Sequence, residues 1–183
     1  MRFLVLFSLL FYRIALADNL PQYSFYDREN AATGSFIGTK TDFVSAVPFD
    51  KPWAALSSAE QERVKSDYEG LKPGDEPPFP EMGLGGIYRR LVRGTLEQKI
   101  EPGVVQAVAV VDARGEVQDV QFYKTPGKVT TAIVAHALLK THFKAGLRDG
   151  KAVQTEYWFE TAMTAGRQCF GRCTVEAEPG RDE

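Results

Sequence analysis

The sequence is poor in the residues that most often build catalytic or metal sites. Its 183 residues include only two histidines and two cysteines, and it contains no Gly-rich phosphate loop, nucleophile elbow or HExxH pattern. Neither sign of charge dominates, because 22 basic residues stand against 24 acidic ones and the formal net charge is −2. Non-specific nucleic-acid binders show a basic excess, so we expect no nucleic-acid partner.

The few histidines and cysteines are poorly spaced for a metal site. His136 and His142 lie in one predicted helix at a spacing that does not place them on the same face. Cys169 and Cys173 are close together, but with the histidines they match none of the usual zinc spacings. We therefore predict no bound metal and no cofactor.

Two carboxylates near the end of the chain are the remaining candidates for acid–base chemistry. Glu156 and Glu160 flank Trp158 on one face of a predicted strand. Paired carboxylates catalyse reactions when they line a cleft, whereas this face is expected to be wet. Solvated strand residues are the better interpretation, and we expect no catalytic residues and no enzyme activity.

The chain begins with an apolar run of signal-peptide length. Residues 3–12 follow a short basic start and lead to an A-x-A cleavage sequence that ends at Ala17, before Asp18. The run is shorter than the roughly 20 residues of a membrane-spanning helix. We predict a signal peptide over 1–17 that is removed between Ala17 and Asp18, with no membrane span left after cleavage. An uncleaved membrane anchor is the alternative.

The cysteine pair agrees with export. Cys169 and Cys173 flank Gly171 in the polar tail over 164–183, and a short loop of this kind can bring two cysteines within bridging distance. Disulfides persist outside the cytosol, so we predict a structural bridge between them. A redox pair usually has two intervening residues at the start of a helix, which makes reactive thiols the less favoured alternative.

Three segments have the features of helices. Residues 56–70 carry a capping-box sequence at 58–61 and end at a glycine. Apolar residues at helical spacing mark about 85–99 and 129–142. The arginines on the outer face of 85–99 could bind an anionic partner, but a solvated face is the better interpretation because every surface helix needs a polar face.

Other segments have the patterns of strands and of a linker. Residues 103–112 are rich in Val and nearly apolar, which indicates a central strand. A tight turn with positive φ at Gly115 leads to a return strand over 116–124. Residues 153–163 alternate between apolar and polar, as expected for a strand with one wet face. The proline-rich segment 72–80 is predicted to be a stiff linker, either a spacer or the entry to a domain.

The order helix, hairpin, helix and strand predicts an α+β fold. We expect a small antiparallel three-stranded sheet with two helices packed on one face, plus an N-terminal helical extension. A short strand over 41–47 is also indicated. The predicted organisation is an extension with one helix over 18–75, a folded domain over 76–163 and the polar tail.

Four phrases of the folded domain carry a family resemblance. They are EPPFP, GVVQAVAVVDARGEVQDVQFYKTPG, VTTAIVAHALLKTHFKAGLRDGKAV and QTEYWFETAM. In this order they resemble the C-terminal domain of TonB-family energy transducers. The resemblance covers about half of the chain, depends on spacing and apolar pattern, and includes no catalytic residue.

The resemblance implies a location and a binding mode. In the family this domain lies in the periplasm of Gram-negative bacteria and binds a short peptide of outer-membrane receptors, which adds as a strand to the sheet edge. It therefore implies a periplasmic protein that binds a protein or peptide and is linked to transmembrane transport. The edge implied for the partner strand lies on the last strand, at Val153, Thr155, Tyr157, Phe159 and Thr161. Native sheets often hide their edges, so an edge covered by the chain's own N-terminal segment or tail is the alternative.

Two departures from the family narrow the expected function. A transducer keeps its N-terminal helix in the inner membrane and spans the periplasm with a long proline-rich spacer, whereas this chain has a predicted cleavable signal and only the short segment 72–80. A soluble periplasmic binding module fits better. A membrane-tethered transducer component and an envelope protein that shares only the fold are the alternatives. A homodimer is compatible with all three functions.

Overall fold

The computed structural model describes residues 22–27 and 39–163. The predicted cleavage site at Ala17 and Asp18 and the predicted Cys169–Cys173 bridge lie outside these residues. In chain order the elements are β1 (Tyr23–Asp27), β2 (Thr39–Ser45), the short 3-10 helix η1 (Trp53–Ala55), α1 (Ser58–Lys65), β3 (Phe79–Pro80), α2 (Gly85–Glu97), β4 (Gly103–Val111), β5 (Val117–Lys124), α3 (Lys128–Leu139), β6 (Phe143–Lys144), β7 (Gly146–Arg148), β8 (Lys151–Val153) and β9 (Thr155–Met163).

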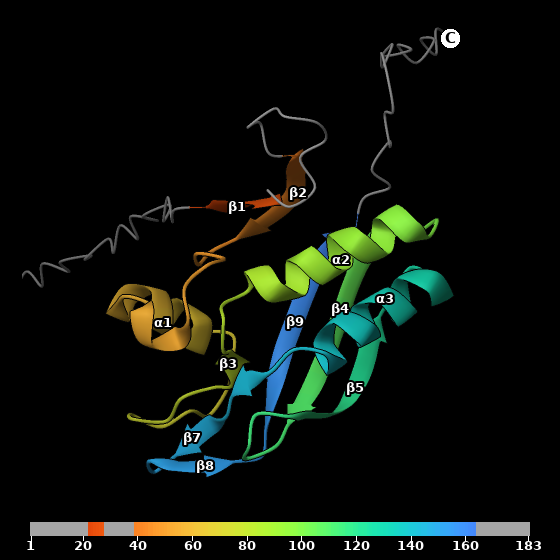
Figure 1. The fold of residues 1–183 in the computed structure, drawn as a ribbon. Helices are drawn as coiled ribbons and strands as arrows, with labels where there is room; N and C mark the ends of the chain where they lie inside the picture. Colours follow the sequence, from red (N-terminus) through yellow and green to blue (C-terminus); the bar gives the residue numbers. More distant parts are fainter. Residues whose placement is uncertain (1–21, 28–38, 164–183) are drawn as a thin grey trace, which may run out of the picture.

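The centre of the fold is a three-stranded antiparallel sheet in the order β5-β4-β9. Helices α2 and α3 lie side by side on one face of this sheet (Figure 1). The predicted α+β fold is therefore confirmed, as is the central place of β4. The turn between β4 and β5 ends at Gly115 with φ +88°, and its carbonyl accepts a hydrogen bond from the Phe143 amide at 2.9 Å.

The sheet buries one face under the two helices. Alternate side chains of β4 and β9 point toward the helices and are buried, while those between them are more exposed. The main contact between the helices is at Gly94, where a Cβ would lie only 2.6 Å from the Ile133 side chain. A glycine at this position lets α2 approach α3 closely. Leu91 lies beneath this contact and is fully buried.

The proline-rich segment is part of the core and not a spacer. Pro77, Pro78, Phe79 and Pro80 are all buried, and β3 pairs with β6. Proline disfavours helix and fits short extended segments, so the sequence correctly indicated extended backbone. Of the two interpretations, the spacer was wrong and the domain entry fits, because the proline rings are themselves apolar and pack against the domain.

The N-terminal part is tied to the same core. Phe25 of β1 packs against Tyr88 of α2 with ring centroids 5.8 Å apart. The Glu60 carboxylate of α1 accepts hydrogen bonds from the Tyr23 hydroxyl at 3.2 Å and the Ser57 amide at 2.7 Å. The capping box therefore pairs Ser57 with Glu60, one residue before the predicted pair. The predicted strand over 41–47 is β2, shifted by two residues, and its partner β1 was not predicted.

The end of α3 also differs from the prediction. The helix ends at Leu139, so His142 lies beyond it and not in the same helix as His136. The His142 imidazole lies 3.0 Å from the Glu116 carboxylate and 3.8 Å from that of Glu81, at the surface. Helix ends are set by tertiary packing as much as by apolar spacing, which is why the pattern overran the end.

Candidate protein-binding edge

The outer edge of β9 exposes backbone hydrogen-bonding groups. In an antiparallel pair, alternate residues direct both backbone groups to the neighbouring strand and the residues between direct theirs away from it. The Trp158 amide donates away from β4, to the Tyr68 hydroxyl at 3.3 Å. By this alternation Glu156, Glu160 and Ala162 also face outward, and a partner strand would pair with these residues.

Four of the five residues predicted for the edge lie on β9, but their backbone groups face β4 and not the outer edge. Tyr157, Phe159 and Thr161 are buried in the core, and Thr155 is half-buried. Their register with β4 directs their backbone groups into the sheet. Val153 ends β8, where it pairs with Gly146.

The outward residues were missed because the side-chain pattern reports burial, not backbone direction. In a strand, both backbone groups of a residue point to the same neighbouring strand, and only the hydrogen-bonding register shows which neighbour that is. The sequence shows the two-residue alternation of side chains, but it does not show how β9 pairs with β4. The sequence does contain one relevant signal, because the residues between the buried ones in this strand are the outward-facing ones: Glu156, Trp158 and Glu160.

Tyr68 covers one position of this edge. Its hydroxyl stands where the carbonyl of an added strand would accept the Trp158 amide hydrogen. Burial raises the pKa of the Tyr68 phenol well above its ordinary value, so the hydroxyl keeps its proton at physiological pH. Tyr68 follows the end of α1, where the sequence had predicted continued helix.

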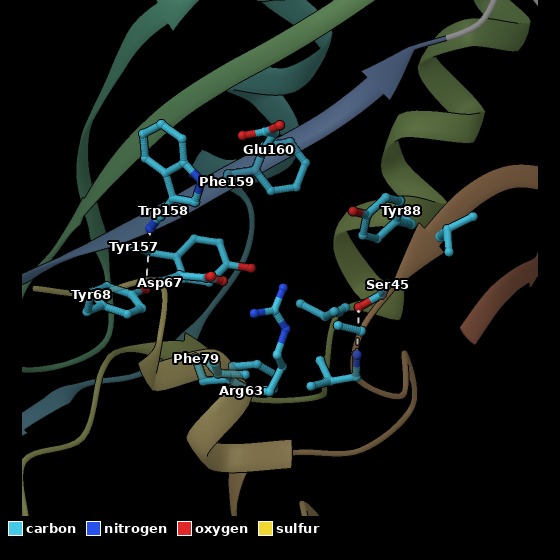
Figure 2. A pocket seen from close by; sticks show the side chains of 15 residues that line it. Ser45, Arg63, Asp67, Tyr68, Phe79, Tyr88, Tyr157, Trp158, Phe159 and Glu160 are labelled. Atoms are coloured by element: carbon cyan, nitrogen blue, oxygen red, sulfur yellow. Dashed lines mark hydrogen bonds between the residues drawn. The ribbon is translucent and has the colours of Figure 1, made fainter. Parts of the chain in front are cut away.

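A groove of about 400 Å³ lies beside the covered position. Three parts of the fold form its walls: the edge of β9, the end of β2 with the residues that follow it, and α1 with the turn after it. The residues that line the groove include Ser45, Arg63, Val64, Asp67, Tyr68, Phe79, Tyr88, Tyr157, Trp158, Phe159 and Glu160. Figure 2 shows Arg63 and the Tyr157 hydroxyl directed into this space. Extended chain laid along β9 would enter the groove.

The polar groups of the groove sit on an aromatic floor. Burial raises the pKa of Tyr88 to about 12 and raises that of Tyr157 well above its ordinary value. Burial also raises the pKa of the Asp67 carboxyl; Arg63 partly offsets the rise and Glu160 adds to it. The two phenols therefore remain hydrogen-bond donors at neutral pH, next to one guanidinium and two carboxylates.

A second pocket of about 600 Å³ continues from the groove. It shares Asp67, Tyr68 and Trp158 with the groove and extends over Val108 and Val110, on the sheet face away from the helices. The ring of Trp158 also lies 6.0 Å from that of the exposed Tyr123. Both pockets therefore border the edge of β9, and Trp158 lines both of them.

The opposite edge of the sheet is blunted. The Val120 amide of β5 is satisfied by the carboxylate of the preceding residue, Asp119, at 2.9 Å. Natural sheets use charged side chains of this kind to prevent pairing at an exposed edge. Each edge therefore has one covered amide, and the two edges differ because β9 lines the groove whereas β5 lines neither pocket.

The described residues give no sign of a catalytic or metal centre at this edge. Glu156 and Glu160 are exposed, and the Glu160 carboxylate accepts a hydrogen bond from the side-chain amide of Gln106 at 3.1 Å. Within residues 22–27 and 39–163 no group of three or more His, Cys, Asp or Glu side chains is placed to hold a metal ion, and no helix there has the length and hydrophobicity to cross a membrane. In comparisons with known proteins, no protein-family model and no curated protein matched this chain.

Proposed function

We propose that the protein is an exported binding module that accepts an extended segment of a partner protein along the outer edge of β9. By its resemblance to TonB-family C-terminal domains, we propose the periplasm as its location and a segment of an outer-membrane receptor as its partner. In this proposal the backbone of the edge supplies affinity and the groove supplies selectivity. The chain would take part in transport across the outer membrane as a binding partner and not as an enzyme.

One observation supports this proposal most strongly. Backbone groups of Glu160 and Ala162 face outward next to the Trp158 amide that Tyr68 covers, and they lie beside a groove with an aromatic floor, whereas the opposite edge on β5 lines neither pocket. An edge with unpaired backbone groups is a template for strand addition. A single edge of this kind, next to a lined groove, is the arrangement that strand addition requires.

The hydrogen bond at Tyr68 favours a second candidate, an edge that the chain closes for itself. In that case the hydroxyl protects the edge from association and the fold serves another role in the envelope. The covered length is short, because this contact satisfies the amide of one residue, Trp158. We favour binding because the groove continues past Tyr68 to Glu160.

Site-specific crosslinking in the native envelope tests the proposal. A photoreactive residue at Glu160 should capture a segment of an outer-membrane receptor, because this side chain is exposed and lines the groove. The same residue placed at Asp119, exposed on the opposite edge, is the matched control and should capture no such segment. Crosslinks from Glu160 that stay within the chain itself would support the closed edge.

A further inference from the structure

The outer side of the helical layer carries a marked excess of positive charge. Helices α2 and α3 cover one face of the sheet, so their exposed side chains point away from it (Figure 1). The exposed basic residues of the two helices and of the residues directly after them are Arg89, Arg90, Arg93, Lys99, Lys128 and Lys140. We call this set the basic helical face. The exposed carboxylate among the same segments is that of Glu97, in a chain whose formal net charge is −2.

The positive charges of this face are not neutralised inside the described structure. Within residues 22–27 and 39–163, the ion pairs involve other basic residues and none of the six. The Arg90 guanidinium donates to the Gly86 carbonyl at 2.9 Å, which holds the side chain along the helix. The nearby Glu101 is half-buried, and its carboxylate accepts hydrogen bonds from the amide and the hydroxyl of Thr130 at 3.1 and 3.0 Å.

The acidic residues of the sheet lie on its other side. Asp119, Glu156 and Glu160 are exposed, and by the alternation of their strands they project from the face that the helices do not cover. These three carboxylates therefore lie opposite the basic helical face, and the exposed Lys124 of β5, which pairs with Gln106, shares their side. A charge distribution of this kind orients a protein in an external field, here with the helices toward negative charge.

We propose that the basic helical face binds the surface of an anionic phospholipid membrane. Clusters of four to eight Lys or Arg residues on a surface are typical of binding to anionic lipid headgroups, and the six residues of this face fall in that range. Leu139 is 48% exposed at the end of α3 and adds an apolar contact beside Lys140. Single-stranded nucleic acids are bound by stacking on exposed aromatic rings, and α2 and α3 carry no exposed Phe, Tyr or Trp, because Tyr88 is buried; His136 is their one exposed ring. This proposal does not depend on a partner at β9, and it would leave that edge clear of the membrane.

Vesicle flotation with the full chain tests this inference. The protein should float with vesicles of phosphatidylcholine mixed with phosphatidylglycerol, and it should stay behind with phosphatidylcholine alone. Binding should weaken as salt is raised, because screening shortens the range of the attraction to about 10 Å at 0.1 M ionic strength. The variant R89Q/R90Q/R93Q should bind anionic vesicles about 100-fold more weakly, since each basic residue near such a surface contributes about a fivefold gain in binding.

A matched control separates this face from net charge. The variant K72Q/K124Q/K151Q removes the same charge from exposed residues outside the two helices and should bind nearly as well as the original protein. An equal loss in both variants would show a non-specific charge effect and overturn the assignment. It would also be overturned by no flotation with anionic vesicles, or by equal flotation with neutral ones. Circular dichroism should show unaltered folding in both variants, because the three side chains replaced in each variant are all exposed.

Discussion

Replacing Tyr68 by Phe should loosen one position of the β9 edge without disturbing the sheet. The change removes the hydroxyl that accepts a hydrogen bond from the Trp158 amide at 3.3 Å, and it keeps the aromatic ring of residue 68. A typical protein hydrogen bond contributes about 0.5–1.5 kcal/mol to stability, and this one is at the long end of the distance range, so we expect a loss of about 0.5–1 kcal/mol. The larger penalty of a buried unpaired donor should not apply, because the freed amide faces the groove.

Amide hydrogen exchange gives the direct assay for this change. In Tyr68→Phe the Trp158 amide should exchange about two- to fivefold faster, as follows from a loss of 0.5–1 kcal/mol. The Phe159 amide should keep its protection, because it is directed to β4. A segment that adds to β9 should bind more tightly by a similar factor, since it no longer competes with the hydroxyl. Unchanged exchange at Trp158, or a selective gain in exchange at Phe159, would refute the assigned direction of these amides.

Three further changes test the fold and the groove. Gly115→Ala should destabilise the domain by more than about 2 kcal/mol in urea denaturation, because φ is +88° and a Cβ would overlap the Phe143 carbonyl. Gly150→Ala is the control: its φ is +74° but its Cβ would lie in open space, so it should cost about 1 kcal/mol. Equal losses in the two variants would contradict the packing of the turn at Gly115 against Phe143. Leu91→Ala should cost about 2–5 kcal/mol, since the side chain is fully buried, and a loss below 1 kcal/mol in the same assay would refute its place in the core. Asp67→Asn should stabilise the protein at pH 7, because the raised pKa of this carboxyl means that folding disfavours its charged form. The stabilisation should shrink as pH falls through the raised pKa of the folded protein, and it should vanish below the lower, ordinary pKa of the unfolded chain, where the carboxyl is protonated in both states. A stabilisation that is equal at acidic pH would contradict this.

The sheet and its helices could be predicted because their patterns are periodic. Alternation over β9 predicted which side chains are buried, and the apolar run of β4 predicted a central strand. Helical spacing located α2 and α3 to within a few residues. Each of these segments buries one continuous face, so its apolar residues recur at the spacing of a strand or a helix.

The parts that form the candidate site are less periodic and were harder to predict. Tyr68 reaches β9 from a turn 90 positions away in the sequence, a contact that no local pattern encodes. The prolines over 77–80 were interpreted as a linker because their backbone preference is clear and their burial is not. The outward direction of the Glu160 amide depends on the register between β4 and β9, which two separate strands determine together.

Proline at the outer edge tests the central claim most directly. Glu160→Pro removes an amide that faces outward and takes no part in the pairing with β4, so the sheet should persist, as proline is tolerated on edge strands. Glu160→Ala keeps that amide and is the matched control, with folding of both variants checked by urea denaturation. The probe is the segment captured by crosslinking from Glu160, with affinity measured by isothermal titration calorimetry. Our account predicts that Glu160→Pro weakens binding about two- to tenfold while Glu160→Ala binds almost as the original protein, given the energy of one lost hydrogen bond. Equal affinity of the two folded variants would contradict strand addition at β9.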